Sequence, residues 1–333
     1  MKKVLVLIFV VVMVFSIVAC GAKTESTSND STEQYTLKLA HVNNAAYPYT
    51  DGSELFKKLV EEGTDGNVII EIYPDGQLGS ERELIEQTQL GTLDFCVTAT
   101  APVSNFIDSF KVFDLPYIFK DQTQEFEVLD GEVGQAMLKE VSDIGLTGLG
   151  FWDNGVRSPS NSKRAINSMA DLKGLKIRVM ENDIMIASYK AMGAIPTSMA
   201  WGEVFTAVQQ GVVDGLESSP VTYSTNALYD IQPYYAVIEP LFSPALFMGC
   251  TANLEKLPEE YMKVITEAAK EATLFERETF KTLANKSVKD LVANGMTVTE
   301  PDKAEFINAC EVVYDEFGDS IGWDLINSIR DTN

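Results

Sequence analysis

The sequence predicts an α/β protein built as two lobes that a long helix connects. Three observations lead to this prediction. The chain has 333 residues, 45% of them hydrophobic and 23% charged, so it is a folded protein long enough for two domains with separate cores. Strand-like and helix-like segments alternate along most of its length. A helical pattern near the C-terminus is too long for one compact lobe.

The alternation begins after the N-terminal region. Residues 35–42 alternate apolar and polar side chains as a strand does, and residues 49–62 place aliphatic side chains on one helical face. A turn cluster at 63–67 separates this helix from a second strand at 68–73. Because helix and strand keep alternating, we expect largely parallel sheets.

Two later segments resemble each other. The runs Gln89-Leu90-Gly91-Thr92-Leu93-Asp94 and Gln209-Gln210-Gly211-Val212-Val213-Asp214 each follow an amphipathic helix and lead into an apolar strand. In both, the glycine is expected to end the helix. A helix–glycine–strand junction is common by itself, and the pair also fits two similar lobes.

The C-terminal helical pattern starts at Pro258 and runs to about Ala293 without an internal glycine or proline. At a rise of about 1.5 Å per residue it exceeds one lobe. Its apolar residues do not keep a strict heptad, so a helix that bridges two lobes fits better than a coiled coil.

The first residues read as an export signal. A short basic start precedes an apolar run from Val4 to Ala19, which is short for a membrane span. Because Ile17-Val18-Ala19-Cys20 resembles a bacterial lipobox, residues 1–19 are expected to be a lipoprotein signal peptide and 20–34 a flexible tether from lipidated Cys20. The alternative is an ordinary signal peptide with an incidental cysteine. The expected location is extracytoplasmic, anchored by lipid to the outer face of the cytoplasmic membrane.

Composition excludes several classes of function. There are 26 basic against 49 acidic residues, a formal charge of -23, which repels nucleic acid and anionic lipid surfaces. His41 is the only histidine, so a histidine-rich zinc site cannot form and no metal site is expected. Cys96, Cys250 and Cys310 lie in apolar surroundings and are expected to be buried free thiols.

Catalytic signatures are lacking. The chain has no glycine-rich phosphate loop with lysine, no G-x-S-x-G elbow and no C-x-x-C motif. Ser218-Ser219-Pro220 follows a strand without a nearby base. We therefore expect binding rather than catalysis, with no cofactor.

Arginines are the strongest candidates for a binding site. Only six occur in the chain, and Arg157, Arg164 and Arg178 fall within 22 residues of one another. If the guanidinium groups of Arg157 and Arg178 reach one cleft, they would hold a carboxylate by charge-assisted, bidentate hydrogen bonds. The alternative is that both are exposed or pair with local acids.

Other candidates are weaker. Asn161 would read ligand hydroxyl groups or simply set a turn, and Trp201 would form a stacking wall or belong to the core. His41, at the end of the first strand, would donate to a ligand or cap its own strand.

Seven short segments together resemble the extracytoplasmic solute-binding proteins of tripartite ATP-independent periplasmic (TRAP) transporters, of the dicarboxylate-binding type. The resemblance covers residues 35 to 330. The segments, in the order in which they occur, are Leu39-Ala40-His41-Val42, the run from Tyr73 to Glu81 with Gln89-Leu90-Gly91, Phe113 to Phe119, Gly155-Val156-Arg157 with Asn161 to Arg164, Asp171 to Val179, Trp201-Gly202-Glu203-Val204, and Gln210 to Gly215.

The resemblance implies a two-lobe, periplasmic-binding-protein-like fold with a ligand cleft between the lobes and a long helix spanning both. Lobe I would contain residues 35–154 plus 243–282, and lobe II residues 155–242 plus 283–333. The resemblance also implies that Arg178 forms a salt bridge with the substrate carboxylate, with Arg157 as a second donor. The partner would be a two-component membrane permease driven by a sodium or proton gradient, and no nucleotide would be bound.

Two departures bear on the substrate. Ser218 stands where the family often has asparagine, and Thr98-Ala99-Thr100 lacks the glutamate of sialic-acid binders. The resemblance therefore favours a sugar acid such as glucuronate or galacturonate. Its hydroxyl groups would be read by five polar residues, His41, Asn43, Glu81, Asn161 and Ser218.

Two alternatives to a sugar-acid binder remain. The first is a protein that binds a C4-dicarboxylate or 2-oxo acid, which would need Arg157 or Arg164 as a second cation for the far end of the ligand. A lipid-anchored surface hydrolase would need a nucleophile and a base that meet at His41.

Overall fold

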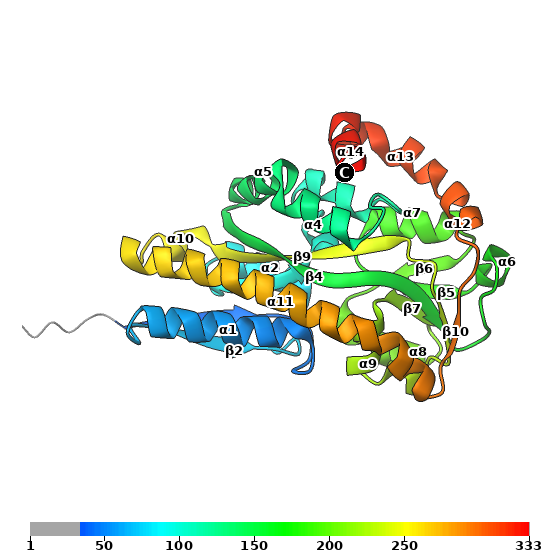
Figure 1. Cartoon of the computed structure of the whole chain (residues 1–333), viewed down its shortest axis with the longest axis horizontal. Coiled ribbons are helices and arrows are strands. Elements are labelled where there is room, and N and C mark those ends of the chain that lie inside the picture. Colours follow the sequence, from blue (N-terminus) through cyan, green and yellow to red (C-terminus); the bar gives the residue numbers. More distant parts are fainter. Residues whose placement is uncertain (1–33, 333) are drawn as a thin grey trace, which may run out of the picture. The chain divides into compact units, whose positions relative to one another are not determined.

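The computed structural model describes residues 34–332. The predicted signal peptide, Cys20 and all but the last residue of the predicted tether lie outside these residues. Residues 34–333 form one compact unit by their contacts. The predicted α/β class is confirmed: strands and helices alternate around one mixed sheet of ten strands in the described residues (Figure 1).

The chain starts with a βαβαβ unit. Its elements, in order, are β1 (Tyr35–Ala40), α1 (Pro48–Gly63), β2 (Val68–Tyr73), α2 (Glu81–Gln89) and β3 (Phe95–Ala99). The strands predicted at 35–42 and 68–73 and the helix at 49–62 are thus confirmed, with small shifts of their ends. β1 pairs in parallel with both β2 and β3.

A second βαβαβ unit lies further along the chain. Its elements, in order, are β5 (Lys176–Val179), α7 (Asp183–Ala191), β6 (Ile195–Ser198), α8 (Trp201–Gln209) and β7 (Gly215–Ser218). β5 again pairs in parallel with both of its neighbours. Each unit therefore has its first strand in the middle.

The two similar segments of the sequence occupy matching places in these units. Gly91 (φ +73°) and Gly211 (φ +69°) take the left-handed conformation just after α2 and α8, as expected for a glycine that ends a helix. Asp94 accepts a hydrogen bond from the Lys38 amide at 2.8 Å, and Asp214 accepts one from the Lys176 amide at 2.9 Å. The segments are therefore a true structural repeat.

Two long antiparallel strands, β4 (Leu146–Asn161) and β9 (Leu241–Cys250), join the units. Residues 146–157 of β4 pair with β9, which also pairs with β3, whereas residues 158–161 pair with β7. The strand order is β2-β1-β3-β9-β4-β7-β5-β6, and β8 (Tyr234–Ala236) links β4 to β10 (Thr297–Thr299). We call residues 153–156 of β4 the crossover, because the register with β9 shifts between Asp153 and Val156.

Gly155 lies in the crossover with φ +84°. A Cβ atom added there would lie 2.6 Å from Cζ of Phe280 and 2.7 Å from Cβ of Ser219. Both the backbone conformation and the close approach require glycine at this position.

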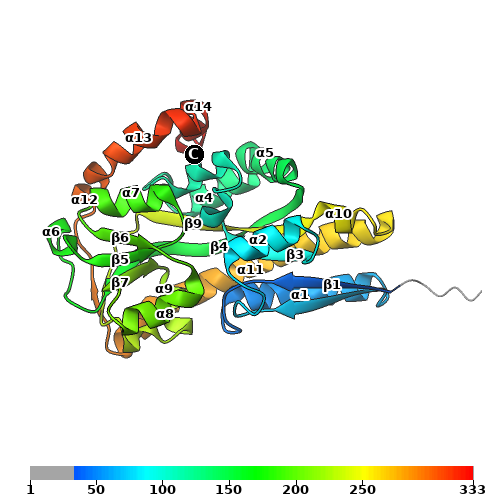
Figure 2. The ribbon, with the colours of Figure 1, turned by 180° about the vertical axis from the view of Figure 1, so that it is seen from behind.

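The predicted long helix is confirmed as α11 (Glu259–Ala293). It packs beside α1 and crosses β4, and its far end contacts α9 (Pro220–Thr225) and β10 (Figures 1 and 2). The helix therefore spans the elements of both βαβαβ units.

The remaining helices cover the sheet. They are, in order, α3 (Thr100–Val103), the 3-10 helix η1 (Asp108–Asp114), α4 (Gln122–Asp130), α5 (Glu132–Glu140), the 3-10 helix η2 (Val141–Ile144), α6 (Met169–Leu172), the 3-10 helix η3 (Leu228–Asp230), α10 (Thr251–Leu254), α12 (Ala304–Ala309), α13 (Glu311–Ile321) and α14 (Trp323–Arg330).

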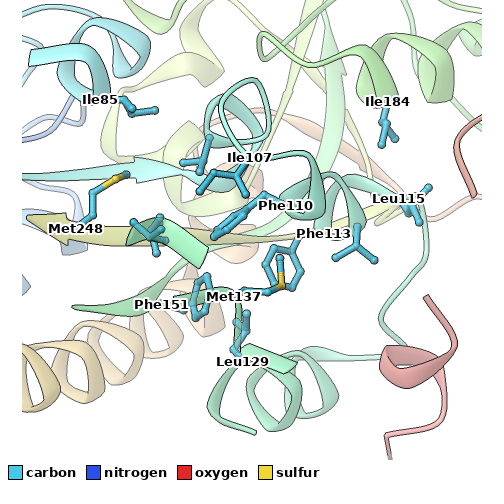
Figure 3. Packing of buried hydrophobic residues seen from close by; sticks show 14 of the residues in the cluster. Ile85, Ile107, Phe110, Phe113, Leu115, Leu129, Met137, Phe151, Ile184 and Met248 are labelled. Carbon is cyan, nitrogen blue, oxygen red and sulfur yellow. The ribbon is translucent and has the colours of Figure 1, made fainter. Parts of the chain in front are cut away.

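Apolar side chains fill the space on both faces of the sheet. On one face Phe110, Phe113 and Phe151 pack together with Met137 and Leu129 from the helices that follow (Figure 3). Cys96, Cys250 and Cys310 are buried free thiols, as the sequence predicted. No helix within residues 34–332 combines the length and the apolar character that crossing a bilayer requires.

Candidate functional site

A small cavity of about 30 Å³ lies where strands of the two βαβαβ units end. It is next to the carboxyl ends of β1, β5 and β7, and to the N-termini of α2 and α8. Ligands of open α/β sheets bind at such strand ends. The lining residues are Val42, Asn43, Glu81, Asn154, Arg157, Arg178, Met180, Trp201, Ser218 and Thr222.

Arg178 is 2% exposed and comes from β5. Its Nε and Nη2 donate to the Met199 carbonyl at 3.0 and 2.8 Å, and its Cζ lies 5.9 Å from the ring centroid of Trp201. Nη1 has its nearest carboxylate oxygen, Oε1 of Glu217, at 4.0 Å, beyond hydrogen-bond distance. Burial lowers the pKa of Arg178 to about 10, and Glu217 opposes this shift. The side chain is thus charged at neutral pH and has no close anionic partner.

Arg157, 3% exposed, is held by Glu217 instead. Its Nε donates to Oε2 at 2.6 Å, and its Nη2 donates to Oε1 at 3.0 Å and to the Glu217 carbonyl at 2.9 Å. Burial acts to lower the pKa of Arg157, but the carboxylate of Glu217 raises it overall. One edge of this guanidinium is therefore already occupied by Glu217, and Arg157 also lines the cavity.

Glu81, the first residue of α2, brings a carboxyl group to the cavity from the opposite side. Its Oε1 accepts a hydrogen bond from the Ala99 amide at 2.7 Å. Burial raises the pKa of Glu81, while this hydrogen bond and the charges of Arg178 and Arg157 act in the other direction. Such a carboxyl group suits hydrogen bonds to hydroxyl groups, since its protonated form donates and its ionised form accepts.

Neutral polar groups complete the wall. Asn154 is oriented by two neighbours: its Oδ1 accepts from the Tyr47 hydroxyl at 2.9 Å, and its Nδ2 donates to the Ser243 hydroxyl at 3.2 Å. Asn43, Ser218 and Thr222 add further amide and hydroxyl groups. The arrangement suits a small anion that also carries hydroxyl groups.

The structure brings six of the eight predicted ligand-binding residues to this cavity: Arg178, Arg157, Asn43, Glu81, Ser218 and Trp201. The other two lie outside its lining. Asn161 is fully buried, and its amide bonds the backbone of Lys163 and Arg164, which fixes the turn after β4.

His41 is also fully buried and away from the lining. Its Nε2 lies 3.4 Å from the Thr50 hydroxyl, and its ring packs edge-on against Tyr49. Burial lowers the pKa of His41 to about 4, so the ring is neutral at physiological pH.

Arg164, the second-cation candidate for a dicarboxylate, is directed elsewhere. Its Nε and Nη2 donate to the carbonyl groups of Asp171 and Lys173. Sequence reasoning missed Glu217, Met180 and Thr222. Nothing local to β7 distinguishes Glu217, because its role depends on β4 and β5 lying beside this strand.

A wider groove of about 860 Å³ adjoins the small cavity and shares Val42 and Trp201 with it. Ser80, Arg82 and Glu83 line it from α2 and the turn before it, and Glu203 and Phe205 line it from α8. The groove therefore lies directly beside the cavity that the buried arginines line.

Comparison with known proteins gives a consistent result. A family model described as bacterial extracellular solute-binding protein, family 7 (DctP), matches residues 39–320. A solute-binding protein of Verminephrobacter eiseniae is 38% identical over 279 residues, covering 83% of each chain. The C4-dicarboxylate-binding periplasmic protein DctP of Rhodobacter capsulatus is 31% identical over 308 residues, 90% of this chain and 91% of that protein.

Solved structures agree with these relatives. A TRAP periplasmic solute-binding protein from Polaromonas sp. JS666, bound to D-erythronate, has a TM-score of 0.88 and 34% identity, covering 90% of this chain and 99% of that one. One from Sulfitobacter sp. NAS-14.1, with bound β-D-galacturonate, has a TM-score of 0.86 and 32% identity, covering 89% of this chain and 99% of that one.

Proposed function

The chain belongs to family 7 of the bacterial extracellular solute-binding proteins, the solute-binding components of TRAP transporters, and from this premise we propose that it captures a sugar acid. The favoured ligands are hexuronates such as glucuronate and galacturonate. The protein would deliver the bound ligand to the two-component membrane permease that the family implies.

One observation carries the choice of ligand: of the two arginines in the cavity, only Arg178 lacks a close anionic partner. We assign the ligand carboxylate to Arg178, with the unoccupied edge of Arg157 as a second donor. Asn43, Glu81, Asn154 and Ser218 would then read the hydroxyl groups, beside Trp201. His41 and Asn161, which lie outside the lining, would support the end of β1 and the turn after β4.

A C4-dicarboxylate is less well suited to this cavity. Its second carboxylate needs its own cation, but Glu217 already holds Arg157 by two hydrogen bonds and Arg164 is bonded to backbone carbonyl groups. The C4-dicarboxylate-binding relative keeps this alternative worth testing.

The test is thermal melting of residues 23–333 with uronates, aldonates, C4-dicarboxylates and 2-oxo acids. A ligand at about 100 times its Kd adds about 2.7 kcal/mol of stability, which raises Tm measurably. We expect uronates to raise Tm and C4-dicarboxylates to leave it unchanged. The reverse result would replace the sugar acid by a dicarboxylate.

Variants separate the two proposals further. Arg178→Ala should weaken D-glucuronate binding by about 2–5 kcal/mol, roughly 30-fold to 5,000-fold in Kd by calorimetry. Arg164→Ala is the matched control: it should leave uronate affinity unchanged, but it would weaken the binding of a dicarboxylate held at both ends. Unaltered affinity of the Arg178 variant would show that the carboxylate lies elsewhere.

We further propose that the protein does not transform its ligand. The buried His41 lies away from the cavity, and no other imidazole exists in the chain to serve as a base. Recovery of chemically unchanged D-glucuronate after prolonged incubation supports binding alone, whereas a hydrolysed or rearranged product would establish an enzyme.

We also propose that Cys20 carries a lipid that anchors the protein to the outer face of the cytoplasmic membrane. The lipobox-like run that precedes it supports this assignment. In the native host, Cys20→Ala should move the protein from the membrane fraction to the soluble fraction. A parent chain that is already soluble would instead fit an ordinary signal peptide.

A further inference from the structure

Three carboxyl side chains meet in the interior beneath the ligand cavity. Glu125 comes from α4, Asp153 from the crossover of β4, and Glu276 from α11, and all three are 0% exposed. Asp153 directly precedes Asn154, which lines the cavity. The group therefore lies at the strand segment that links the two parts of the sheet.

Half of its carboxyl oxygens have no hydrogen-bond partner among residues 34–332. Both oxygens of Glu125 and Oε1 of Glu276 accept no hydrogen bond from the described part of the chain. Of these two glutamates, only Glu276 accepts one, through Oε2. That Oε2 accepts from the Asp153 amide at 2.8 Å. Asp153 is better satisfied, since its Oδ1 accepts from the Gly155 amide at 2.7 Å and its Oδ2 accepts from Gln122 at 2.6 Å. Ionised carboxylates in this setting would be costly, because nothing replaces the water they lose.

Within residues 34–332, the cation whose charge acts on all three carboxyl groups is already paired with another acid. Arg277 is the cation that interacts with all three carboxyls, but its Nε donates to the Phe151 carbonyl. Its Nη1 donates to both oxygens of Asp130 at 2.9 Å. The other titratable groups facing the cluster are Tyr47, which precedes α1, and Tyr49 and Asp51 of α1. None of them is cationic. Within residues 34–332 no cluster of acidic, histidine or cysteine side chains is suited to a metal ion.

We propose that Glu125, Asp153 and Glu276 form a buried proton-binding site, in which protons neutralise the carboxyl groups that hold the crossover of β4 in place. Two of the three, Asp153 and Glu276, are positioning residues. Asp153 fixes the Gly155 amide, and Glu276 fixes the Asp153 amide, so together they set the backbone that presents Asn154 and Arg157 to the cavity.

The electrostatics support this proposal. Burial raises the pKa of Asp153 to about 7, against the hydrogen bonds from Gly155 and Gln122. Burial, and then the charge of Asp153, raise the pKa values of Glu125 and Glu276 well above the ordinary range. The folded protein therefore keeps protons on the two glutamates at pH values where the unfolded chain has already released them.

The sign of the pH dependence follows. Because the folded state binds more protons than the unfolded state, stability falls as pH rises from the unfolded pKa, about 4, through the folded pKa values. His41 acts oppositely, but only below its unfolded pKa of about 6.5. Above about pH 8 the buried thiols of Cys96 and Cys310, whose pKa values burial raises to about 12, add a decline of the same sign. The carboxyl contribution is therefore the part of the decline between about pH 7 and about pH 9 that glutamine substitutions remove. Each proton that only the folded state retains raises the unfolding equilibrium constant about tenfold per pH unit.

The experiment measures urea unfolding across this window for the wild-type protein, Glu125→Gln and Glu276→Gln, alone and combined. Glutamine keeps the shape of the protonated side chain but cannot ionise. We expect wild-type stability to decline with pH and the double variant to show a flatter profile. The matched control Glu271→Gln, exposed on the same helix, should keep the wild-type slope. A double variant with the wild-type slope would overturn the proposal.

A second measurement needs no variant. In wild-type protein carrying carbon-13 only at glutamate carboxyl groups, NMR should show at least two glutamates still protonated at pH 7. This label leaves out the buried aspartates. If every glutamate carboxyl signal has moved to its ionised position by about pH 6, the proton-binding site does not exist.

Discussion

At the scale of single residues, Glu217 organises the site. It is fully buried, binds Arg157 by two side-chain hydrogen bonds and lies 4.0 Å from Arg178. One carboxylate between two arginines leaves a single net positive charge among these three side chains. That charge balance favours one ligand carboxylate over two.

The first prediction concerns this ion pair. Glu217→Ala leaves Arg157 buried without its anion, so we expect the free energy of unfolding to fall by about 3–5 kcal/mol. Urea denaturation measures this change. The control Glu86→Ala breaks the exposed pair with Arg82 and should cost at most about 1 kcal/mol. Equal costs for the two variants would mean that Glu217 is not the partner that stabilises Arg157.

The second prediction uses the only histidine. Burial lowers the pKa of His41 to about 4, so its ring stays neutral down to about pH 5. Because the unfolded chain takes up this proton near pH 6.5, His41 costs stability as pH falls from there towards 4. In untagged protein a single imidazole NMR signal reports this titration. A midpoint near 6.5 would contradict the burial of the ring.

The sequence predicted some residues of the candidate site and could not predict others. Arg157 and Arg178 stood out because arginines are rare in this chain, and both line the cavity. Glu217 could not be distinguished among 49 acidic residues, because its role depends on β4, β5 and β7 lying side by side. Asn161 had the right chemistry, but its short side chain is used up by the local turn.

At the scale of elements, the crossover of β4 carries the strictest geometric demand. The third prediction is that Gly155→Ala destabilises the protein more than Gly174→Ala does. Both glycines have positive φ, +84° and +77°, so both variants should lose about 1–2 kcal/mol from backbone strain. Only the alanine at 155 meets other atoms, those of Phe280 and Ser219, whereas nothing lies within 4 Å at 174.

Urea unfolding of the two alanine variants measures this difference, and ligand affinity provides a second readout. Displacing the crossover should also move Asn154 and Arg157, so Gly155→Ala should weaken D-glucuronate binding and Gly174→Ala should not. Equal stabilities would show that the crossover yields to an added methyl group.

Elements were the best-predicted level of the structure. The strand at 68–73 and the helix from 259 to 293 follow from local periodicity and from the absence of internal breakers. The pairing of β4 with two different neighbours could not be read from the sequence, because strand order depends on contacts between distant residues. That same pairing brings Asn154 and Arg157 of β4 beside Ser218 of β7 in the cavity wall.

At the scale of the whole molecule, three long elements connect the two halves of the sheet. They are the strands β4 and β9 and the helix α11. The two proposed lobes, 35–154 plus 243–282 and 155–242 plus 283–333, divide at this place. A ligand closes such a protein only through its higher affinity for the closed state.

The fourth prediction is that saturating D-glucuronate shortens the distance across the groove. Spin labels at Glu86→Cys and Glu203→Cys, which line opposite sides of it, report this distance by electron paramagnetic resonance in residues 23–333. The three native cysteines of that chain are buried, so labelling is selective. A distance distribution that D-glucuronate leaves unchanged, despite measurable binding, would exclude closure.

The repeated βαβαβ units have one more consequence, which concerns ancestry. Aligning their first strands on Lys38 and Lys176, and their last strands on Asp94 and Asp214, matches Val42 with Met180, and both line the cavity. The same alignment places Arg178 where the first unit has Ala40, and Glu217 where it has Val97. The pattern is that of a duplicated half in which one copy has apolar side chains and the other has buried charged side chains at the same places. An approximately symmetric scaffold thereby holds its charged anchor on one side only, and an asymmetric ligand can enter it in a single orientation.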